Sequence, residues 1–397
     1  MDKKEQSREQ IKKQCEFIFN KGNNILLEFA TGVGKTINAI NLQHIMNSQK
    51  TFICVAEIAH IKNWEDEYVK HGHKELLKTT EIFCYASLKK YQGKSCELLI
   101  LDEVHHAFTE NRMEYLLSIS KKRTIGLSAT LTEEDRYRFK ESFGANDIFE
   151  ITMDQAIEME LLPKPQLNII GLELNDKINS ETIIFKRGTP TKIVYCEYIQ
   201  KSHYILNKKQ YYNIELHISC NQKQKYQYID EEYEHLKRMA HFSTASKFKW
   251  LNYGNVRKRF LSDCKTEIIQ QLCTQLSNEH KRFICFCGSI EQAELIGGDN
   301  CVHSKKDSSK IISKFNKKDI DSIFAMKMLT EGMNLTDIQS AIISQLDGTE
   351  RPFIQRTGRG LRAEFPVIYV IYIKGTKDED YLLNVTNNIP EEYISYL

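Results

Sequence analysis

The chain has 397 residues, which at about 150 residues per domain allows two or three domains with their own hydrophobic cores. Its 55 lysines and arginines nearly balance 53 aspartates and glutamates, so the net charge of +2 excludes a uniformly basic protein, and any polyanion-binding surface must be local. The 11 cysteines include no Cys-x-x-Cys pair, which disfavours structural zinc and indicates a reducing compartment. Cys285 and Cys287 are close in sequence, and we expect a strand to point them to opposite faces.

The start of the chain and its apolar runs bear on its location. The N-terminal segment MDKKEQSREQ is charged from the beginning, and the apolar run VIYVIYI at 367–373 is far shorter than the roughly 20 residues that span a bilayer. We therefore expect a cytoplasmic protein without a signal peptide or a membrane partner, in a prokaryotic cell or in the cytosol of a virus-infected host.

Short apolar runs that end in polar loops alternate with helix-period segments along the first part of the chain. The runs predict strands at 24–30, 51–57, 81–87, 97–103 and 124–130. Strands that alternate with helices indicate a parallel sheet covered by helices on both faces. A second series predicts the same architecture again, with strands at 282–288, 322–328, 341–347 and 367–373.

The segment between the two series is less regular. MELLPKPQL at 159–167 carries two of the 6 prolines, which suits a linker because proline stops helices, and we place a boundary near Pro163. The alternating pattern ETIIFKRGTPTKIVYCEYI predicts a hairpin about Gly188, expected to be a plain edge hairpin rather than a strand-separating wedge. Lys- and Tyr-rich helical stretches follow, and 265–276 predicts an amphipathic helix.

The segment KFKWLNYGNVRKRF at 247–260 leaves two interpretations open. It interleaves basic and aromatic side chains, a mixture that stacks on bases while neutralising phosphates. A helix packed at the entry to the second domain would also bury aromatic residues and keep its basic groups in water. We prefer the packed helix.

The stretch FATGVGKT at 29–36 is the strongest chemical signal, and it lies between an apolar run and the helix-forming INAINLQHIM. Glycines let backbone N–H groups point into a tight loop around phosphates, a lysine reaches the terminal phosphates, and a hydroxyl binds Mg²⁺. The strict P-loop pattern has glycine where this chain has Phe29, so the match is to the core of the motif. The predicted ATP-binding residues are Thr31, Gly32, Val33, Gly34, Lys35 and Thr36.

The stretch LLILDEVHHAF at 98–108 ends an apolar run in two carboxylates and two histidines. A P-loop enzyme needs a second acidic strand end beside its loop to hold Mg²⁺ and orient water. We therefore expect Asp102, with Thr36, to hold Mg²⁺, largely through water, and Glu103 to polarise the attacking water. His105 and His106 are disfavoured as zinc ligands because adjacent histidines on such a turn are expected to diverge.

With these two sites in place, the chain resembles the superfamily 2 helicases and translocases through nearly its whole length. DEVH at 102–105 resembles the DEAH-type motif II, LSAT at 127–130 motif III, MLTEGMNL at 328–335 motif V, and QRTGRGLR at 355–362 motif VI. The resemblance implies an α/β fold of two tandem RecA-like domains, each a parallel sheet flanked by helices. The first would span 1–163 and the second 281–397, with an inserted hairpin and helical segment at 164–280.

The resemblance also implies roles for residues in these motifs. Gln10 is placed like an adenine-reading glutamine, and His105 is expected to sense the nucleotide state through motif VI. Two arginines three apart on one helix face can reach phosphates across an interdomain cleft. The expected catalytic set is Lys35, Glu103, Gln355, Arg359 and Arg362, with Gly332 and Asn334 at the nucleotide and Ser128, Ala129 and Thr130 coupling it to nucleic acid.

Opening and closing of the cleft would move a nucleic acid that both domains grip. The grip is expected to be phosphate-directed and sequence-tolerant. YASLKKY at 85–91 and NWEDE at 63–67 resemble the branch of restriction-enzyme translocating subunits and phage branched-DNA helicases, so branched or duplex DNA is the expected partner. The expected contacts are Ala59, His60, Lys62, Gly288, Ser289 and Thr330.

The sequence therefore predicts an ATP- and Mg²⁺-dependent DNA helicase or translocase. Two alternatives stay open: an ATPase subunit or nucleotide switch of a multi-protein defence or restriction complex, and an RNA helicase. No nuclease motif stands out, so any DNA cleavage would need a nuclease or another partner subunit.

Overall fold

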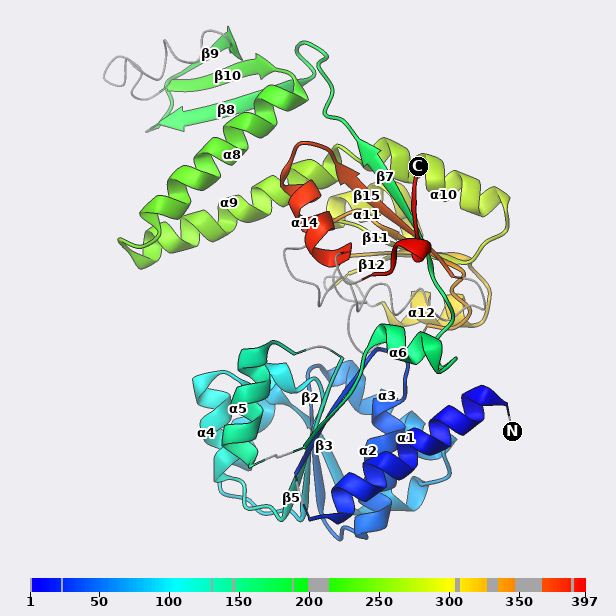
Figure 1. The fold of residues 1–397 in the computed structure, drawn as a ribbon. Coiled ribbons are helices and arrows are strands. Elements are labelled where there is room, and N and C mark those ends of the chain that lie inside the picture. Colours follow the sequence, from blue (N-terminus) through cyan, green and yellow to red (C-terminus); the bar gives the residue numbers. More distant parts are fainter. Residues whose placement is uncertain are drawn as a thin grey trace.

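Two parallel sheets, each flanked by helices, form the framework of the computed structural model (Figure 1). Within the part that is described, no helix combines the length and the apolar content needed to cross a bilayer. The structure describes residues 2–22, 24–129, 131–144, 147–187, 189–198, 214–303, 308–326, 335–346, 366–386 and 389–397.

The first sheet has the strand order β3-β2-β4-β5-β1-β6, and all its neighbouring strands are parallel. Its strands are β1 (Ile25–Phe29), β2 (Thr51–Val55), β3 (Thr80–Cys84), β4 (Leu98–Leu101), β5 (Arg123–Ser128) and β6 (Asp147–Ile151). The strands β1, β2 and β4 are buried along their whole length, as a sheet with helices on both faces requires.

Alternate side chains of these strands enter two separate cores. Ile25 and Leu27 pack with helices α1 (Lys3–Asn20), α2 (Lys35–Met46) and α3 (Ile58–Lys70), whereas Leu26 packs on the opposite face with α4 (Glu110–Ser118) and α5 (Glu133–Phe143). Figure 1 shows α1 to α3 and α4 to α5 on opposite sides of the sheet. The short helices η1 (Lys74–Thr79), η2 (Tyr85–Tyr91) and η3 (Val104–Ala107) complete the connections, and α6 (Met153–Glu158) follows β6.

The second sheet has the order β12-β13-β11-β14-β15-β7-β16, again with parallel neighbours throughout. This confirms the expected α/β class with two helix-flanked parallel sheets. Its strands are β7 (Gln166–Leu172), β11 (Phe283–Phe286), β12 (Cys301–Val302), β13 (Ser322–Ala325), β14 (Ser340–Ile343), β15 (Val367–Ile373) and β16 (Ile394–Tyr396). Its helical elements are α10 (Thr266–Asn278), α11 (Ile290–Gly297), η5 (Gly298–Asn300), α12 (Ser309–Asn316), α14 (Lys377–Thr386) and η7 (Glu391–Tyr393).

Strand β7 differs from the expectation that 164–280 is an insertion ahead of the second domain. It directly follows the proline-containing linker and pairs with β15 and β16 within the second sheet. Because Leu167 and Ile169 are almost completely buried there, the chain contributes one strand to the second domain before it builds the irregular segment.

The predicted hairpin about Gly188 is wrong. β8 (Glu181–Arg187) and β9 (Lys192–Glu197) belong to one three-stranded sheet, but β10 (Ile214–Cys220) lies between them, antiparallel to β8 and parallel to β9. The buried side chains of β10 fill the core that β8 and β9 share. Alternation in the sequence identified both strands, but it cannot show which strand lies next to which. Gly188 itself lies outside the described residues.

Helices α8 (Gln222–Met239) and α9 (Thr244–Asp263) pack against each other and project from the second domain (Figure 1). The C-terminal half of α9 has the packing role that we preferred for 247–260: Phe260 is buried, and the guanidinium of Arg257 lies 3.8 Å from the ring centroid of Tyr233. The N-terminal half is open, since Phe248 is 62% exposed.

The expectation that Cys285 and Cys287 face opposite ways is also wrong. Their sulfur atoms lie 3.8 Å apart, and both side chains enter the same core cluster. Residues two apart on a strand share one face, so this spacing brings the thiols together.

A buried ion pair holds three elements of the second domain together. Lys265, at the start of α10, is fully buried and contacts the carboxylate of Asp378 in α14, which is 3% exposed. The same ammonium donates to the carbonyl of Ser344, directly after β14. Removing one partner would leave the other charge buried and uncompensated, which is far more costly than losing an exposed ion pair.

We predict that Lys265→Met lowers the unfolding free energy of the second domain by about 3–5 kcal/mol, because Asp378 loses its partner inside the protein. Calorimetry should show the loss, and adding Asp378→Leu should recover much of it. The control is Lys318→Met, which breaks an exposed pair with Asp337 and should cost less than about 1 kcal/mol. Equal losses in the two single variants would contradict the prediction.

Candidate functional site

The loop between β1 and α2 has the backbone that a phosphate-binding loop needs. Gly32 and Gly34 have φ values of +95° and +106°, in the left-handed region that other residues rarely adopt. A Cβ atom on Gly32 would also lie 3.1 Å from a methyl carbon of Leu162, which belongs to the linker. Val33 is buried and anchors the loop to the core between the two glycines.

Lys35 begins α2 and folds back over this loop. Its ammonium donates to the carbonyl oxygen of Phe29 over 2.9 Å, so the positive charge lies above the end of β1. The amide of Asn38 donates to the carbonyl of Gly34 over 2.9 Å and holds the loop to the first turn of α2. The loop therefore presents one cation and the N-terminus of a helix to the same space, the arrangement that binds an anion.

The acidic pair follows β4 at the same edge of the sheet, since parallel strands present their carboxyl ends together. Glu103 has φ +46°, a left-handed conformation that costs a non-glycine residue of order 1–3 kcal/mol. The turn is held by the backbone N–H of Glu103, which donates to Oδ1 of Asp102 over 3.1 Å. A strained backbone that sets the direction of a carboxylate is typical of a functional site.

Two aromatic residues hold Asp102, and the sequence reasoning missed both roles. The indole N–H of Trp64, which is 2% exposed, donates to Oδ2 of Asp102 over 2.9 Å. The hydroxyl of Tyr85 donates to the backbone carbonyl of Asp102 over 3.1 Å. Burial raises the pKa of Tyr85 well above its usual range, so the phenol keeps its proton and remains a donor. The tryptophan in the polar stretch NWEDE could have indicated this role, because the N–H of a buried indole needs a hydrogen-bond acceptor.

His105 lies beside the acidic pair. Its Nδ1 is 3.6 Å from Oε2 of Glu103, and the two side chains are only 10% and 16% exposed. The ring centroids of His105 and His106 are 4.3 Å apart, so the expected divergence of the two histidines is wrong. The backbone of His106 is fixed by Arg112, which donates to its carbonyl over 2.7 Å.

A buried carboxylate, that of Glu28 in β1, connects the strand before the phosphate loop to the segment after β5. Its Oε1 accepts from the backbone N–H of Leu131 over 2.7 Å, and its Oε2 accepts from Arg136 in α5 over 2.8 Å. Arg136 also donates to Glu150 over 2.7 Å, and the hydrogen bond with Glu28 is the main cause that raises the pKa of Arg136. The charged residue inside the apolar run NILLEFA was a signal that the sequence reasoning left unused.

Ser128, the last residue of β5, is buried and lies opposite Glu28 in the β1–β5 pairing, and Ala129, which follows it, is also buried. Glu28 therefore joins the strand that leads into the phosphate loop to the segment in which we expected coupling. Thr130 lies outside the described residues.

One cleft of about 1670 Å³ collects these groups. Of the expected nucleotide and metal residues, it is lined by Thr31 to Thr36, Asp102 and Glu103; it is also lined by His60 and Trp64 from α3 and by linker residues 161–164. Gln10 is exposed on α1 and is not among the lining residues, although its neighbours Glu9 and Ile11 are. The structure thus brings the P-loop and the acidic pair together but does not place Gln10 with them.

The expected nucleic-acid contacts are scattered. Lys62 is exposed on α3, whereas His60 is 3% exposed and faces the cleft. The side chain of Ala59 is outside the described part. Lys62 and His60 therefore do not present one common surface.

Gly288 and Ser289, two of the expected nucleic-acid contacts, are buried. Gln292 accepts from the N–H of Gly288 over 2.9 Å and from the hydroxyl of Ser262 over 2.8 Å. A Cβ atom on Gly288 would lie 2.2 Å from the Ser262 hydroxyl oxygen, so the end of α9 covers this turn. Ser289 is used to cap α11 by accepting from the N–H of Gln292.

The remaining expected site residues lie outside the described residues. They are Thr330, Gly332, Asn334, Gln355, Arg359 and Arg362.

Comparison with known proteins finds similarity to helicases and translocases. Residues 264–364 match the Helicase_C family, the helicase conserved C-terminal domain. The chain is 23% identical over 376 residues to the DNA 3'-5' translocase XPB2 of Sulfurisphaera tokodaii, covering 89% of this chain and 78% of that protein. It is 27% identical over 146 residues to the putative helicase 161L of Invertebrate iridescent virus 6, covering 32% of this chain and 33% of that protein.

The chain is thus similar to helicases in its C-terminal part and, over most of its length, to a DNA translocase. The structure of S. cerevisiae Dbp5 bound to RNA and ADP BeF3 matches with a TM-score of 0.58 at 10% identity, over 94% of this chain and 85% of that one. At this identity the match supports the tandem RecA-like fold alone. The sequence relationships support a nucleic-acid motor in general, and the helicase family implies the use of ATP.

With Asp102 as the Mg²⁺ ligand proposed below, we predict that Trp64→Phe keeps the packing of α3 but raises the Mg²⁺ concentration for half-maximal ATPase activity about tenfold. Asp102 would lose a hydrogen bond to a charged acceptor, a contribution of about 1.5–3 kcal/mol. Steady-state ATPase assays across Mg²⁺ concentrations measure the shift. Trp250→Phe, on α9, is the matched control and should leave the curve unchanged; an unshifted Trp64→Phe curve would contradict the prediction.

We predict that Arg136→Met lowers the free energy of unfolding of the first domain by about 3–5 kcal/mol. The reason is that Glu28 is 3% exposed and would keep an uncompensated charge. Adding Glu28→Gln should recover part of the loss. The control is Arg138→Met on the same helix, which breaks an exposed pair with Glu134 and should cost less than about 1 kcal/mol. Scanning calorimetry compares the three variants, and similar losses in both arginine variants would refute the role of Glu28.

Proposed function

We propose that this protein is an ATP-dependent superfamily 2 motor that moves on or remodels DNA. The observation that carries the proposal is the convergence of Lys35, Thr36, Asp102 and Glu103 on one cleft at the carboxyl edge of the first sheet. A phosphate-binding loop or an acidic turn alone has many uses. The two together, on one edge of a parallel sheet, are the parts that hydrolysis of a nucleoside triphosphate needs.

The phosphates of ATP would occupy the loop that Lys35 now covers. The ammonium of Lys35 would leave the carbonyl of Phe29 and donate to the terminal phosphates, since a charged phosphate oxygen is the stronger acceptor. The positive φ values of Gly32 and Gly34 let the loop backbone approach the phosphate chain closely. The N-terminus of α2 would contribute its dipole to the same charge.

Thr36 and Asp102 would hold Mg²⁺, and their donor set fits this ion. A hydroxyl and a carboxylate are hard oxygen ligands, which Mg²⁺ prefers over nitrogen or sulfur. When bound, the ion neutralises charge that develops on the transferred phosphoryl group. Trp64 would hold the Asp102 carboxylate in one orientation from the side of α3.

Glu103 would orient and polarise the water that attacks the terminal phosphate. Its backbone is left-handed, and Nδ1 of His105 lies 3.6 Å from Oε2 of its carboxylate. We propose that His105 passes the nucleotide state on to motif VI, where Arg359 and Arg362 would stabilise the transition state from the second domain. Gln355, Gly332 and Asn334 would complete that wall of the cleft.

Domain closure would connect hydrolysis to movement. The linker already contacts the nucleotide loop, since Leu162 lies against Gly32 and residues 161–164 line the cleft. In this proposal, residues 1–163 and 281–397 act as the two motor domains, with 164–280 leading into the second. A change at the loop would thus act directly on the hinge between them.

DNA is the proposed substrate because the related archaeal protein, named as a DNA translocase, aligns with 89% of this chain. The described basic and aromatic residues of α9 do not decide between nucleic acids. RNA-specific activity, and a nucleotide switch within a defence complex, are outcomes that the experiment below separates from the proposal.

We predict that DNA stimulates the ATPase activity of the wild-type protein, and that Glu103→Gln lowers the stimulated kcat by about 10²- to 10⁴-fold while ATP still binds. The carboxylate that activates water is lost, but the loop and Lys35 remain. Steady-state assays with single-stranded, duplex and forked DNA and RNA, together with ATP-binding titrations, provide the measurement.

Glu110→Gln, an exposed change on the first turn of α4, is the control and should behave like the wild type. High basal hydrolysis that no nucleic acid stimulates would favour the nucleotide switch and contradict the motor. Stimulation by RNA alone would contradict the choice of DNA.

A further inference from the structure

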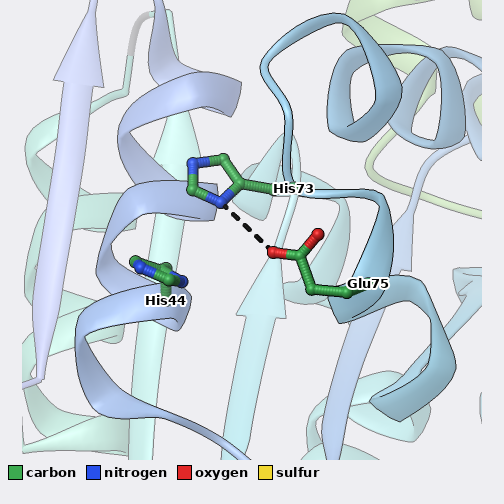
Figure 2. A group of neighbouring side chains, drawn as sticks. All are labelled: His44, His73 and Glu75. Carbon is green, nitrogen blue, oxygen red and sulfur yellow. Dashed lines mark ion pairs between the residues drawn. The ribbon is translucent and has the colours of Figure 1, made fainter.

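Three side chains that bind metal ions well converge on the surface of the first domain, away from the proposed nucleotide site. Figure 2 shows His44 on α2 facing His73 and Glu75, which lie at the start of η1. The ring centroids of the two histidines are 4.9 Å apart, and Nδ1 of His73 is 3.8 Å from Oε1 of Glu75. One ligand atom from each residue lies within 4.8 Å of the other two, a grouping found nowhere else among the described residues.

The backbone that carries His73 and Glu75 is fixed independently of any ion. Gly72, at φ +77°, lets the chain turn after α3. The N–H of His73 then donates to the carbonyl of Tyr68 over 2.8 Å, and its carbonyl accepts from the N–H of Leu76 over 3.0 Å. These bonds hold both ends of the turn, so the two side chains leave a defined piece of backbone.

Buried hydrogen bonds also fix α2 against this turn. Gln43, the residue before His44, is fully buried and donates to the hydroxyl of Thr80 over 2.8 Å. The hydroxyl of Tyr68 donates to the side-chain oxygen of the same glutamine. The three ligand-bearing segments are therefore joined from beneath, and only exposed or half-exposed side chains need to move to close around an ion.

We propose that His44, His73 and Glu75 form a surface site for one divalent transition-metal ion of the zinc class. Two imidazole nitrogens and one carboxylate oxygen are ligands that Zn²⁺ accepts in four-coordinate geometry, with water in the remaining position. Two imidazoles make Mg²⁺ or Ca²⁺ a poor match, because these ions prefer oxygen throughout. His44, which is exposed, supplies the adjustment that brings the ligand atoms to about 2 Å from the metal.

The electrostatics of the site agree with this geometry. Burial, with the nearby His44 ring as the next cause, lowers the pKa of His73. The carboxylate of Glu75 supplies negative charge, which offsets part of the charge of a divalent ion. His71, two residues before His73, is occupied differently, since its Nε2 lies 3.1 Å from Oε2 of Glu67.

The metal site is separate from the nucleotide cleft, but the helices α2 and α3 that it would connect also carry residues that line the cleft. His44, His73 and Glu75 are not among the residues that line the cleft. The ion would connect the end of α2 to the segment that follows α3. Helix α2 begins at Lys35, and helix α3 carries Trp64. Binding to the folded state alone would stabilise the first domain.

The test uses protein without an affinity tag and without nucleotide, titrated with Zn²⁺ in a calorimeter and followed by thermal unfolding. We expect one ion per chain and a midpoint of unfolding that rises by a few degrees at saturation. His44→Ala and His73→Ala should each weaken the affinity at least about tenfold and remove the shift. Co²⁺ bound at the site should give a tetrahedral visible spectrum without sulfur-to-metal charge transfer.

His71→Ala is the matched control, because it removes a neighbouring histidine outside the proposed ligand set and should keep the affinity within about twofold. Circular dichroism verifies that each variant is folded. The proposal is overturned if the wild type shows no saturable Zn²⁺ binding below about 100 μM. It is equally overturned if His44→Ala and His73→Ala bind as the wild type does, or if Mg²⁺ produces the same thermal shift.

Discussion

Parallel pairing of the strands is the constraint on which the candidate site depends. Every neighbouring pair in the first sheet runs in the same direction, so the polar residues that follow β1 and β4 emerge at one edge. An antiparallel neighbour would send one of these groups to the opposite edge. The same rule applies in the second sheet, so the two domains repeat one architecture without repeating its sequence.

Buried polar groups then fix the side-chain orientations and the helix positions that parallel strand pairing does not determine. Trp64 and Tyr85 orient Asp102 from two sides, and Glu28 joins β1 to the segment after β5. In the second domain, Lys265 and Asp378 fix the start of α10 against α14. Each of these groups is costly to bury alone, so each couples two elements that would otherwise pack by shape only.

The contact between Leu162 and Gly32 gives the fold a direct connection between its linker and its nucleotide loop. The linker residues 161–164 line the same cleft as Lys35 and Asp102. A ligand that changes the loop would therefore act on the linker without an intervening element. This arrangement suits the proposed motor, whose domains would move relative to each other when the nucleotide changes.

Local pattern in the sequence predicted five of the six strands of the first sheet (all but β6) and four of the seven strands of the second (β11, β13, β14 and β15). It also predicted the phosphate loop and the acidic turn, because hydrophobic periodicity, glycine positions and charge at strand ends are properties of neighbouring residues. Tertiary structure alone decided that β10 separates β8 from β9, that β7 joins the second sheet, and that Gly288 is covered by α9. It also decided that Trp64 donates a hydrogen bond to Asp102, 38 positions away, and that Arg136 pairs with Glu28, 108 positions away. Such pairings depend on which distant segments pack together, and no short window of sequence contains both partners.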